Sequence, residues 1–483
     1  MKKQVGVMVP LFSLKGDFGI GDLDSLYRLV DTLDHTGIGI IQLLPMNALM
    51  GSETSPYSSI SGFALHPLYI SLRRLRYVQE MPKALEPTTR VNYEGAYSVK
   101  YQAFREAYAH FTKHATPTEK QRFSQFVRNQ KSWLKDYSLF HALAEHHHKA
   151  WWDWPTEHQN PKSASKWGEE NAHLVEYIAF LQWVLFEQWQ DLKSYASEKG
   201  IRFMGDLPLY VSKNSADYWS RPEIFKKGVR AGVPPDLYAK EGQDWGNPIY
   251  DWDVMKKNKY SWWKERMIWL KEYFDLMRID HVRGLYSYWE IPDGKKPIDV
   301  KDWTPGPKKA IIDALKSTGI EIIGEDLGDI PPDVEKWMED IDIAGYRVFL
   351  FGWGPYKSEK YRFSEKFPVQ SLACTSTHDS ESYMEFLESL SEEQVYELGT
   401  YLGIKAGTDF TIEDLRIGSL KKLLQSPSRF VIIPLQDITG EAIRINLPGS
   451  VGEANWSAVL AMGPREQAQI QVFAKMVSEC LTP

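Results

Sequence analysis

The sequence has 483 residues, of which 43% are hydrophobic and 25% are charged, proportions typical of folded globular proteins. Its net charge of −7 offers no basic surface for nucleic acid, so we expect no nucleic-acid partner. Only two cysteines, Cys374 and Cys480, are present, which excludes a disulfide scaffold or a cysteine-based zinc site and fits a reducing cytoplasm. The first apolar run is short and broken by Pro10, so we expect neither a secretory signal nor a membrane span.

Eight short apolar runs that end in polar or charged residues follow one another along the chain. Continuous apolar runs are typical of strands buried on both faces, as in a parallel sheet. Helical patterns lie between most of them, for example at 24–36, 174–198 and 307–317. Strands that alternate with helices in this way predict an α/β fold, a (β/α)8 TIM barrel, with an open doubly wound sheet as the alternative. The runs lie at 5–11, 39–45, 201–208, 274–280, 321–328, 345–352, 371–379 and 429–437.

The connections between these runs are uneven. About 150 residues separate the second run from the third, far more than an ordinary connection needs. We therefore expect residues 1–50 to supply the first two barrel strands, residues 51–200 to form a mainly helical insertion, and residues 201–483 to complete the barrel. The stretch at about 226–252 is dense in Gly, Pro, Trp and Tyr, which predicts an ordered loop that covers the substrate at the barrel mouth.

Several carboxylates stand at the ends of predicted strands. Side chains alternate along a strand, so Arg278 and Asp280 share the face that points into a barrel. Asp206, Glu325 and Asp379 end three other runs. Each alone has a structural explanation, such as an ion pair for Asp280 or a helix cap for Asp379. Together they are costly to bury without a purpose, and they predict a functional site at the C-terminal face of the barrel.

Two kinds of chemistry fit these side chains. A metal site made of His281, His378, Asp280 and Glu325 lacks any local ligand spacing such as HExxH, so we expect no metal. Glycosyl chemistry needs an ionised carboxylate as nucleophile and a protonated one as acid, about 5–5.5 Å apart for retention. Arg278 favours an ionised Asp280, and desolvation among aromatic residues favours a protonated Glu325. The 18 Trp and 25 Tyr residues agree with sugar binding, although core packing explains most of them.

At this point the residues match a known family. Over nearly its whole length the chain resembles the 4-α-glucanotransferases of the amylomaltase type, glycoside hydrolase family 77. The matching stretches are FGIGDL (18–23), SPYSSISGFALHPL (55–68), WWDWP (151–155), GDLPLYVSKNSADYW (205–219), AGVPPD (231–236), GQDWGNPIYDW (242–252), RIDHVRG (278–284), GEDLG (324–328), TSTHD (375–379), PLQD (434–437), and NLPGS with NW within 446–456.

The resemblance implies a TIM barrel that transfers α-1,4-glucan segments between maltodextrins or starch-derived glucans and glucose or glucan acceptors, without a cofactor. It implies Asp280 as the nucleophile, Glu325 as the general acid/base, and Asp379 as a third carboxylate that holds sugar hydroxyls. An α-1,4-glucan hydrolase with the same carboxylates and a non-catalytic glucan-binding protein are the alternatives. The sequence gives no indication of oligomeric state. The substrate-binding residues implied are Tyr57, Asp206, Trp245, Asn247, Tyr250, Arg278, His281 and His378.

The sequence departs from the usual family pattern at a few positions. Ser380 and Glu381 stand where the family usually has Asn-Asp, His66 precedes Pro67, and Asp244 lies within GQDWGNP. None of these changes alters the three carboxylates, so we expect them to bear on acceptor and chain-length preference.

Overall fold

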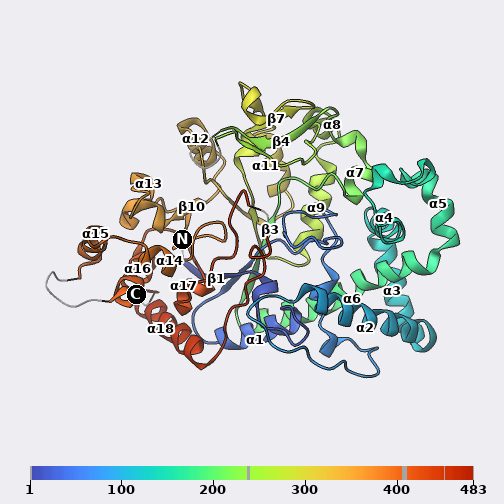
Figure 1. Ribbon diagram of the computed structural model, residues 1–483, viewed down its shortest axis with the longest axis horizontal. Helices are drawn as coiled ribbons and strands as arrows, with labels where there is room; N and C mark the ends of the chain where they lie inside the picture. Colours follow the sequence, from blue (N-terminus) through green and yellow to red (C-terminus); the bar gives the residue numbers. More distant parts are fainter. Residues whose placement is uncertain (1–2, 236–239, 405–410, 451, 482–483) are drawn as a thin grey trace.

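Eight parallel strands form a nearly closed barrel in the computed structural model, which describes residues 3–235, 240–404, 411–450 and 452–481 (Figure 1). The strands are hydrogen-bonded in the order β10-β11-β12-β1-β2-β3-β6-β9, and a parallel bridge from Ile323 to Ala344 joins the last strand to the chain entering the first. The predicted (β/α)8 barrel is therefore confirmed. The strands are β1 Gln4–Val9, β2 Ile40–Leu43, β3 Arg202–Leu207, β6 Leu276–Ile279, β9 Glu321–Gly324, β10 Gly345–Val348, β11 Ser371–Cys374 and β12 Phe430–Pro434.

The register of these strands decides which side chains meet at the C-terminal face. Asp206 on β3 pairs with Arg278 on β6, and Ile279 on β6 pairs with Gly324 on β9. Asp280 and Glu325 therefore leave their strands at adjacent points of the same rim. The strand residues themselves are almost all buried, as expected for continuous apolar runs covered on both faces.

Helices follow the strands where the sequence predicted them. The patterns at 24–36, 174–198 and 307–317 form α1, α6 and α11, and α6 is followed by Gly200 with φ +71, a backbone conformation that favours glycine. The helices that flank the barrel are α1 Leu23–Leu33, α7 Ala216–Ser220, α8 Trp252–Lys257, α9 Ser261–Lys271, α10 Arg283–Tyr286, α11 Lys309–Lys316, α12 Pro332–Asp340, α13 Glu359–Arg362, α14 Tyr383–Glu388, α15 Glu392–Leu402, α16 Ile412–Gln425, α17 Leu435–Thr439 and α18 Pro464–Leu481.

The long connection between β2 and β3 is helical and lies at the opposite end of the molecule from α15 and α18 (Figure 1). Aromatic rings of α2, α3 and α6 pack on one another in its interior, with Phe111 and Phe123 in edge-on contact and both rings against Trp183. The helices are α2 Tyr93–His114, α3 Pro117–Asn129, α4 Leu134–His147, α5 Pro161–Glu170 and α6 Ala172–Glu198.

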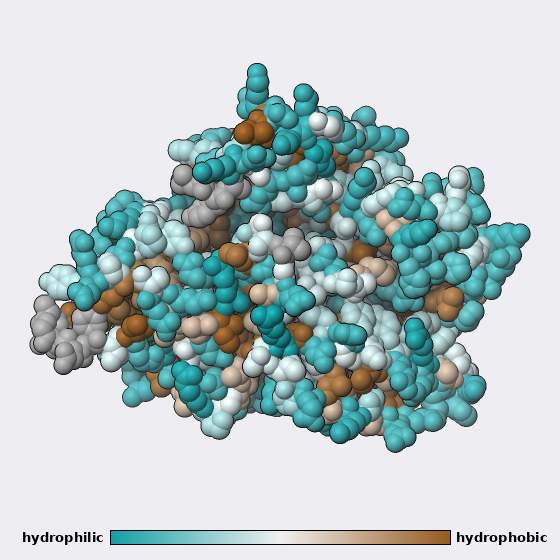
Figure 2. Space-filling model, viewed as in Figure 1, coloured by the Kyte–Doolittle hydropathy of each residue, from teal (hydrophilic) through white to brown (hydrophobic). Residues whose placement is uncertain are grey.

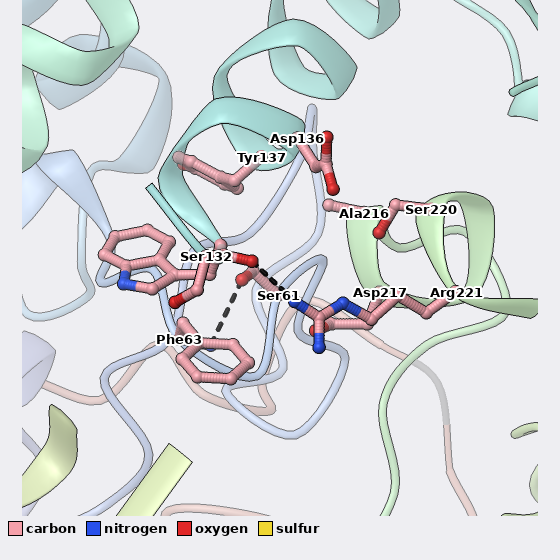
Figure 3. A pocket seen from close by; sticks show the side chains of 10 residues that line it. Ser61, Phe63, Ser132, Asp136, Tyr137, Ala216, Asp217, Ser220 and Arg221 are labelled. Atoms are coloured by element: carbon pink, nitrogen blue, oxygen red, sulfur yellow. Dashed lines mark hydrogen bonds between the residues drawn. The ribbon is translucent and has the colours of Figure 1, made fainter. Parts of the chain in front are cut away.

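Buried polar contacts fasten this helical region to the barrel. Lys100 of α2 is fully buried, and its ammonium donates to Asp22, the N-cap of α1, at 2.7 Å. On another side, a cavity of about 10 Å³, room for about one water molecule, lies between the start of α4 and α7 (Figure 3). Arg221 reaches across it and donates to the Ser132 carbonyl at 2.6 Å. This cavity is a packing junction, because it is far too small for a sugar.

A second, four-stranded antiparallel sheet stands above the barrel, in the order β5-β4-β7-β8 (Figure 1). The stretch at 226–252, predicted as an ordered loop, contributes β4 Val229–Val233 and β5 Gln243–Asp244, while residues 236–239 lie outside the described part. Its partners β7 Ser287–Pro292 and β8 Thr304–Pro305 come from a later connection, and such distant pairing is not visible in a local sequence pattern.

Short 3-10 turns complete the fold, at Leu11–Ser13, Pro67–Tyr69, Leu72–Arg74, Trp151–Asp153, Thr156–His158, Pro222–Ile224, Pro297–Asp299, Phe349–Gly352 and Ser364–Lys366. The surface seen in Figure 2 is mostly hydrophilic, with hydrophobic residues in small separate groups. No helix in the described part of the chain combines the length and the apolar content that a membrane crossing requires.

Candidate active site

Arg278 lies at the centre of the charged groups on the rim. It is 4% exposed, and its Nη1 is 2.6 Å from both carboxylate oxygens of Asp206. Its Nη2 is 3.0 Å from Oδ1 of Asp280 and 4.0 Å from Oε2 of Glu325. Burial opposes the charge of Arg278, but Asp206, Tyr57 and Asp280 together outweigh it and raise the pKa of the guanidinium. One permanent cation thus holds three carboxylates in place.

Asp280 and Glu325 lie close together because they share this guanidinium nitrogen. Oδ1 of Asp280 is 3.0 Å and Oε2 of Glu325 is 4.0 Å from the same nitrogen, so these two oxygens can be no farther apart than the sum of the two distances. Their surroundings differ: the Asp280 side chain is 27% exposed and the Glu325 side chain 11%. Asp280 is therefore the more accessible of the two carboxylates, while Glu325 is more shielded from water.

Glu325 is oriented by the backbone. Its Oε2 accepts from the amide of His281 at 2.8 Å, and its Oε1 accepts from the amide of Leu327 at 2.7 Å. Burial raises the pKa of Glu325 to about 7, although Arg278 and the two amides act in the opposite direction. Near neutral pH this carboxyl group exists in both protonation states, as a group that must give and then take a proton requires.

His281 joins the two strand ends. Its φ of +48 is unusual for a residue other than glycine, and its amide is the donor that holds Glu325 Oε2. Burial lowers the pKa of His281 to about 4, so the ring is neutral at physiological pH. The ring meets Trp245 edge-on, with centroids 5.1 Å apart, which links the predicted covering segment to the carboxylates.

Tyr57, His378 and Asp379 form the opposite side of the site. The Tyr57 hydroxyl donates to Asp206 at 2.8 Å and lies 3.0 Å from His378 Nε2, and the two rings are stacked. The same Nε2 is 3.2 Å from Asp379 Oδ2. Desolvation opposes ionisation of Asp379, but His378 and the amide of Asn446 outweigh it and lower the pKa to about 2. The Asp379 side chain is 47% exposed, so a ligand can reach this fixed negative charge.

Two residues of this side had no role in the sequence analysis. Asn446 Nδ2 donates to Asp379 Oδ1 at 2.7 Å, and the Trp456 ring lies 5.8 Å from Tyr57 and 6.0 Å from His378 between centroids. Both belong to the NLPGS and NW stretches that supported the family resemblance, which was the only sequence indication of their importance.

The other residues predicted on the covering segment hold that segment in place. The Asn247 side chain donates to the Val211 carbonyl at 2.9 Å. Tyr250 is fully buried, stacked on Phe225 and in contact with Trp263. The structure therefore brings Tyr57, Asp206, Trp245, Arg278, His281 and His378 together with the three carboxylates, whereas Asn247 contacts Val211 and Tyr250 contacts a group of buried aromatic rings.

The described residues offer no set of ligands for the metal site considered as an alternative. Among the described residues, no group of three or more His, Cys, Asp and Glu side chains lies close enough to hold a metal ion. The guanidinium of Arg278 takes the place that a cation would occupy between Asp206, Asp280 and Glu325.

The fold and site define the class of this protein, a (β/α)8 barrel with a cluster of carboxylates at the C-terminal face, where barrel enzymes carry their active sites. Residues 9–462 match the family described as 4-alpha-glucanotransferase, glycoside hydrolase family 77, and the chain belongs to that family. It is 35% identical to the 4-alpha-glucanotransferase of Synechocystis, over 94% of this chain and 93% of that protein. It is 32% identical to the Thermus thermophilus 4-alpha-glucanotransferase, over 98% and 99% of the two chains.

The fold agrees with this assignment. The amylomaltase from Streptococcus agalactiae, solved in complex with acarbose, superposes with a TM-score of 0.89 at 27% identity and covers 99% of each chain. The chain is thus an enzyme of the 4-alpha-glucanotransferase class, as the resemblance predicted.

Proposed function

We propose that this enzyme transfers α-1,4-glucan segments by retaining double displacement, with Asp280 as nucleophile and Glu325 as general acid/base. The observation that carries the proposal is the contrast between these two carboxyl groups: they share the Arg278 guanidinium, yet Glu325 is largely shielded from solvent, with a pKa of about 7, while Asp280 is more accessible. Such a pair, with different environments a few ångströms apart, supplies both an acid and a nucleophile.

In the first step Glu325 gives its proton to the glycosidic oxygen while Asp280 attacks the anomeric carbon, so the glycosidic bond breaks and a glucosyl ester forms. In the second step Glu325, now a carboxylate, takes the proton of an acceptor 4-hydroxyl. The freed oxygen displaces Asp280, and the configuration of the donor is retained. All proton and bond transfers use protein carboxyl groups, so no cofactor is required.

The donor sugar in this proposal lies between the Asp379 side and the Trp245 side of the site. Asp379 accepts hydrogen bonds from sugar hydroxyls, since its low pKa keeps it ionised throughout the working range. Tyr57 and His378 hold Asp379 and Asp206 at the bottom of the site and offer their stacked rings to the sugar. We expect acarbose, found in the streptococcal amylomaltase, to bind at this position.

Transfer competes with hydrolysis, because water can resolve the ester as well as a sugar does. The test is incubation with maltotriose: transfer yields glucose together with maltodextrins longer than the starting material, whereas hydrolysis yields only shorter products. If the wild-type protein forms only shorter products, it is a glucan hydrolase. If it binds acarbose but turns over no substrate, it is a glucan-binding protein. Free Cys374 and Cys480 fit the cytoplasmic location we propose for this activity.

A further inference from the structure

Asp437 is a buried carboxylate for which the proposed chemistry has no use. It lies in the first turn of α17, three residues after the end of β12, within the PLQD stretch that supported the family resemblance, and it is fully buried. A buried charge is costly unless it is paired or hydrogen-bonded, so its partners indicate what it is for.

Within the described part of the chain, the side chain of Asp437 accepts hydrogen bonds from three residues of one turn. The hydroxyls of Thr375 and Ser376 each donate to Oδ2 at 2.5 Å, and the amide of Tyr383 donates to Oδ1 at 2.8 Å. The hydroxyl distances are those of charge-assisted hydrogen bonds, which are about twice as strong as neutral ones. Asp437 thus holds both ends of residues 375–383, the segment that carries His378 and Asp379.

Near its tip the turn is also held from outside, because Asn446 Nδ2 donates to Asp379 Oδ1 at 2.7 Å and Arg444 Nη2 donates to the Asp379 carbonyl at 3.3 Å. Its internal hydrogen bonds run from the Thr377 amide to Ser380 Oγ at 3.0 Å and from the Asp379 amide to Thr377 Oγ1 at 3.3 Å. The predicted alternative, that Asp379 caps the next helix, is not what the structure has, because Ser382 caps α14. The position of the Asp379 carboxylate therefore depends on Asn446 and on how the two ends of the turn are fixed.

The anchor itself is rigid. The backbone carbonyl of Asp437 accepts from Nη1 of Arg416, a fully buried residue of α16, at 3.0 Å. The hydroxyl of Tyr383 donates to Ser419 Oγ of the same helix at 2.7 Å. The end of β12, the start of α14 and α16 thus form one fixed block beneath the turn.

We propose that Asp437 is a positioning residue that holds the turn 375–383 so that His378 and Asp379 face the donor sugar. This inference rests on the proposed function of Asp379. A carboxylate suits the task because it accepts all three hydrogen bonds, whereas an asparagine has one accepting oxygen and turns an NH₂ group toward a donor. The wild-type charge is therefore not replaceable by a side chain of the same shape.

The test uses three substitutions at this anchor. Asp437→Asn is expected to lower kcat for maltotriose transfer about 10–100-fold and to weaken acarbose binding about tenfold, because displacement of a reacting group by about 1 Å has effects of that size. Ser376→Ala and Thr375→Val each remove a single hydrogen bond and keep the buried charge, so we expect losses of about 3–10-fold with the fold intact. The KM for glucose as acceptor should stay within about twofold of wild type, since the turn lies on the donor side.

The matched control is Asp22→Asn, which also removes a buried carboxylate with a charged partner, Lys100, but at the contact between α1 and α2. It is expected to lower the melting temperature without changing kcat per folded molecule well below that temperature. If Asp437→Asn lost activity only in proportion to the fraction of unfolded protein, as the control does, the proposal would be overturned.

A double-mutant cycle separates positioning from general structural damage. If Asp437 acts through Asp379, then Ser376→Ala should have less than about a twofold effect in an Asp379→Asn background, although it has a larger effect in the wild type. Equal effects in both backgrounds would assign the anchor a merely structural role and overturn the proposal. A wild type without transferase activity would instead overturn the proposed function, and the assignment of Asp437 would fall with it.

Discussion

Arg278 in the barrel and Trp269 on α9 are each only 4% exposed, but opposite kinds of neighbour surround them. The partners of Arg278 are acidic or hydroxyl-bearing, among them Asp206 and Asp280. Trp269 packs on aromatic rings of the insertion, and its one polar atom donates to the Phe63 carbonyl at 2.9 Å. Burial of charge contributes little to stability compared with burial of hydrocarbon. We therefore expect substitutions among the carboxylates around Arg278 to affect activity, and substitutions around Trp269 to affect stability.

The largest effect is expected from Asp280→Asn, which removes the proposed nucleophile. An amide cannot form the glucosyl ester, so transfer from maltotriose should fall by about 10⁴-fold or more. The melting temperature should stay close to that of the wild type, because Arg278 keeps its two contacts with Asp206. Initial rates and thermal melts on the same preparations check both. A variant with near-normal rates would remove Asp280 as the nucleophile.

The pH dependence of the rim follows from Glu325. Burial raises its pKa to about 7, above the ordinary glutamate value, so the acid form that the first step needs is present below that pH and lost above it. We expect kcat/KM to fall about tenfold per pH unit on the alkaline side, measured from about pH 5 to about pH 9. In Glu325→Gln this limb should disappear, and a donor with a fluoride leaving group should recover part of the lost rate. An unchanged alkaline limb in that variant would assign it to another residue.

Trp269→Phe tests the other side of the comparison. The smaller ring leaves a gap among Trp133, Phe186 and Tyr273 and loses the bond to Phe63, so unfolding should become easier by about 1–3 kcal/mol. Because no atom of Trp269 belongs to the rim, kcat should be unchanged at temperatures where the protein is folded. Chemical denaturation measures the free energy of unfolding, and initial rates measure kcat. A tenfold loss of kcat in fully folded protein would mean that the insertion acts on the chemistry.

The smallest effect is expected from Tyr250→Phe. Within the described part of the chain the Tyr250 hydroxyl is buried without a hydrogen-bond partner, so its removal should change stability by no more than about 1 kcal/mol, in the stabilising direction. If the Tyr250 side chain stays buried during the reaction, the rates and the acarbose affinity of this variant should equal those of the wild type. A weaker affinity would show that Tyr250 reaches the sugar, as the family resemblance implied, through a rearrangement of its segment.

The sequence predicted the barrel because its strands are covered on both faces and so appear as continuous apolar runs. Such a run does not show where the strand stops: the run at 345–352 is a strand only to Val348, and its second half coils into a 3-10 turn. The strand-end acids, including Glu325, were visible for the same reason, as polar residues directly after apolar ones.

The parts that sequence patterns missed depend on distant contacts. Asn446 and Trp456 come from an irregular segment with no periodicity, and their role follows only from their position against Asp379 and Tyr57. The burial of Tyr250 was equally hidden, because a Gly- and Pro-rich stretch is typical of an exposed loop and the rings that enclose Tyr250 lie elsewhere in the sequence. The resemblance to known proteins identified such residues without explaining them.

The pairing of β1 with β12 has a consequence for how the protein is made. Val5 pairs with Val431, so the first strand lacks its second neighbour until nearly the entire polypeptide has left the ribosome. At about 5–20 residues per second this wait lasts on the order of tens of seconds. During that time an apolar strand edge stays open to association with other chains, and we expect newly made protein to depend on chaperones until its last strand arrives.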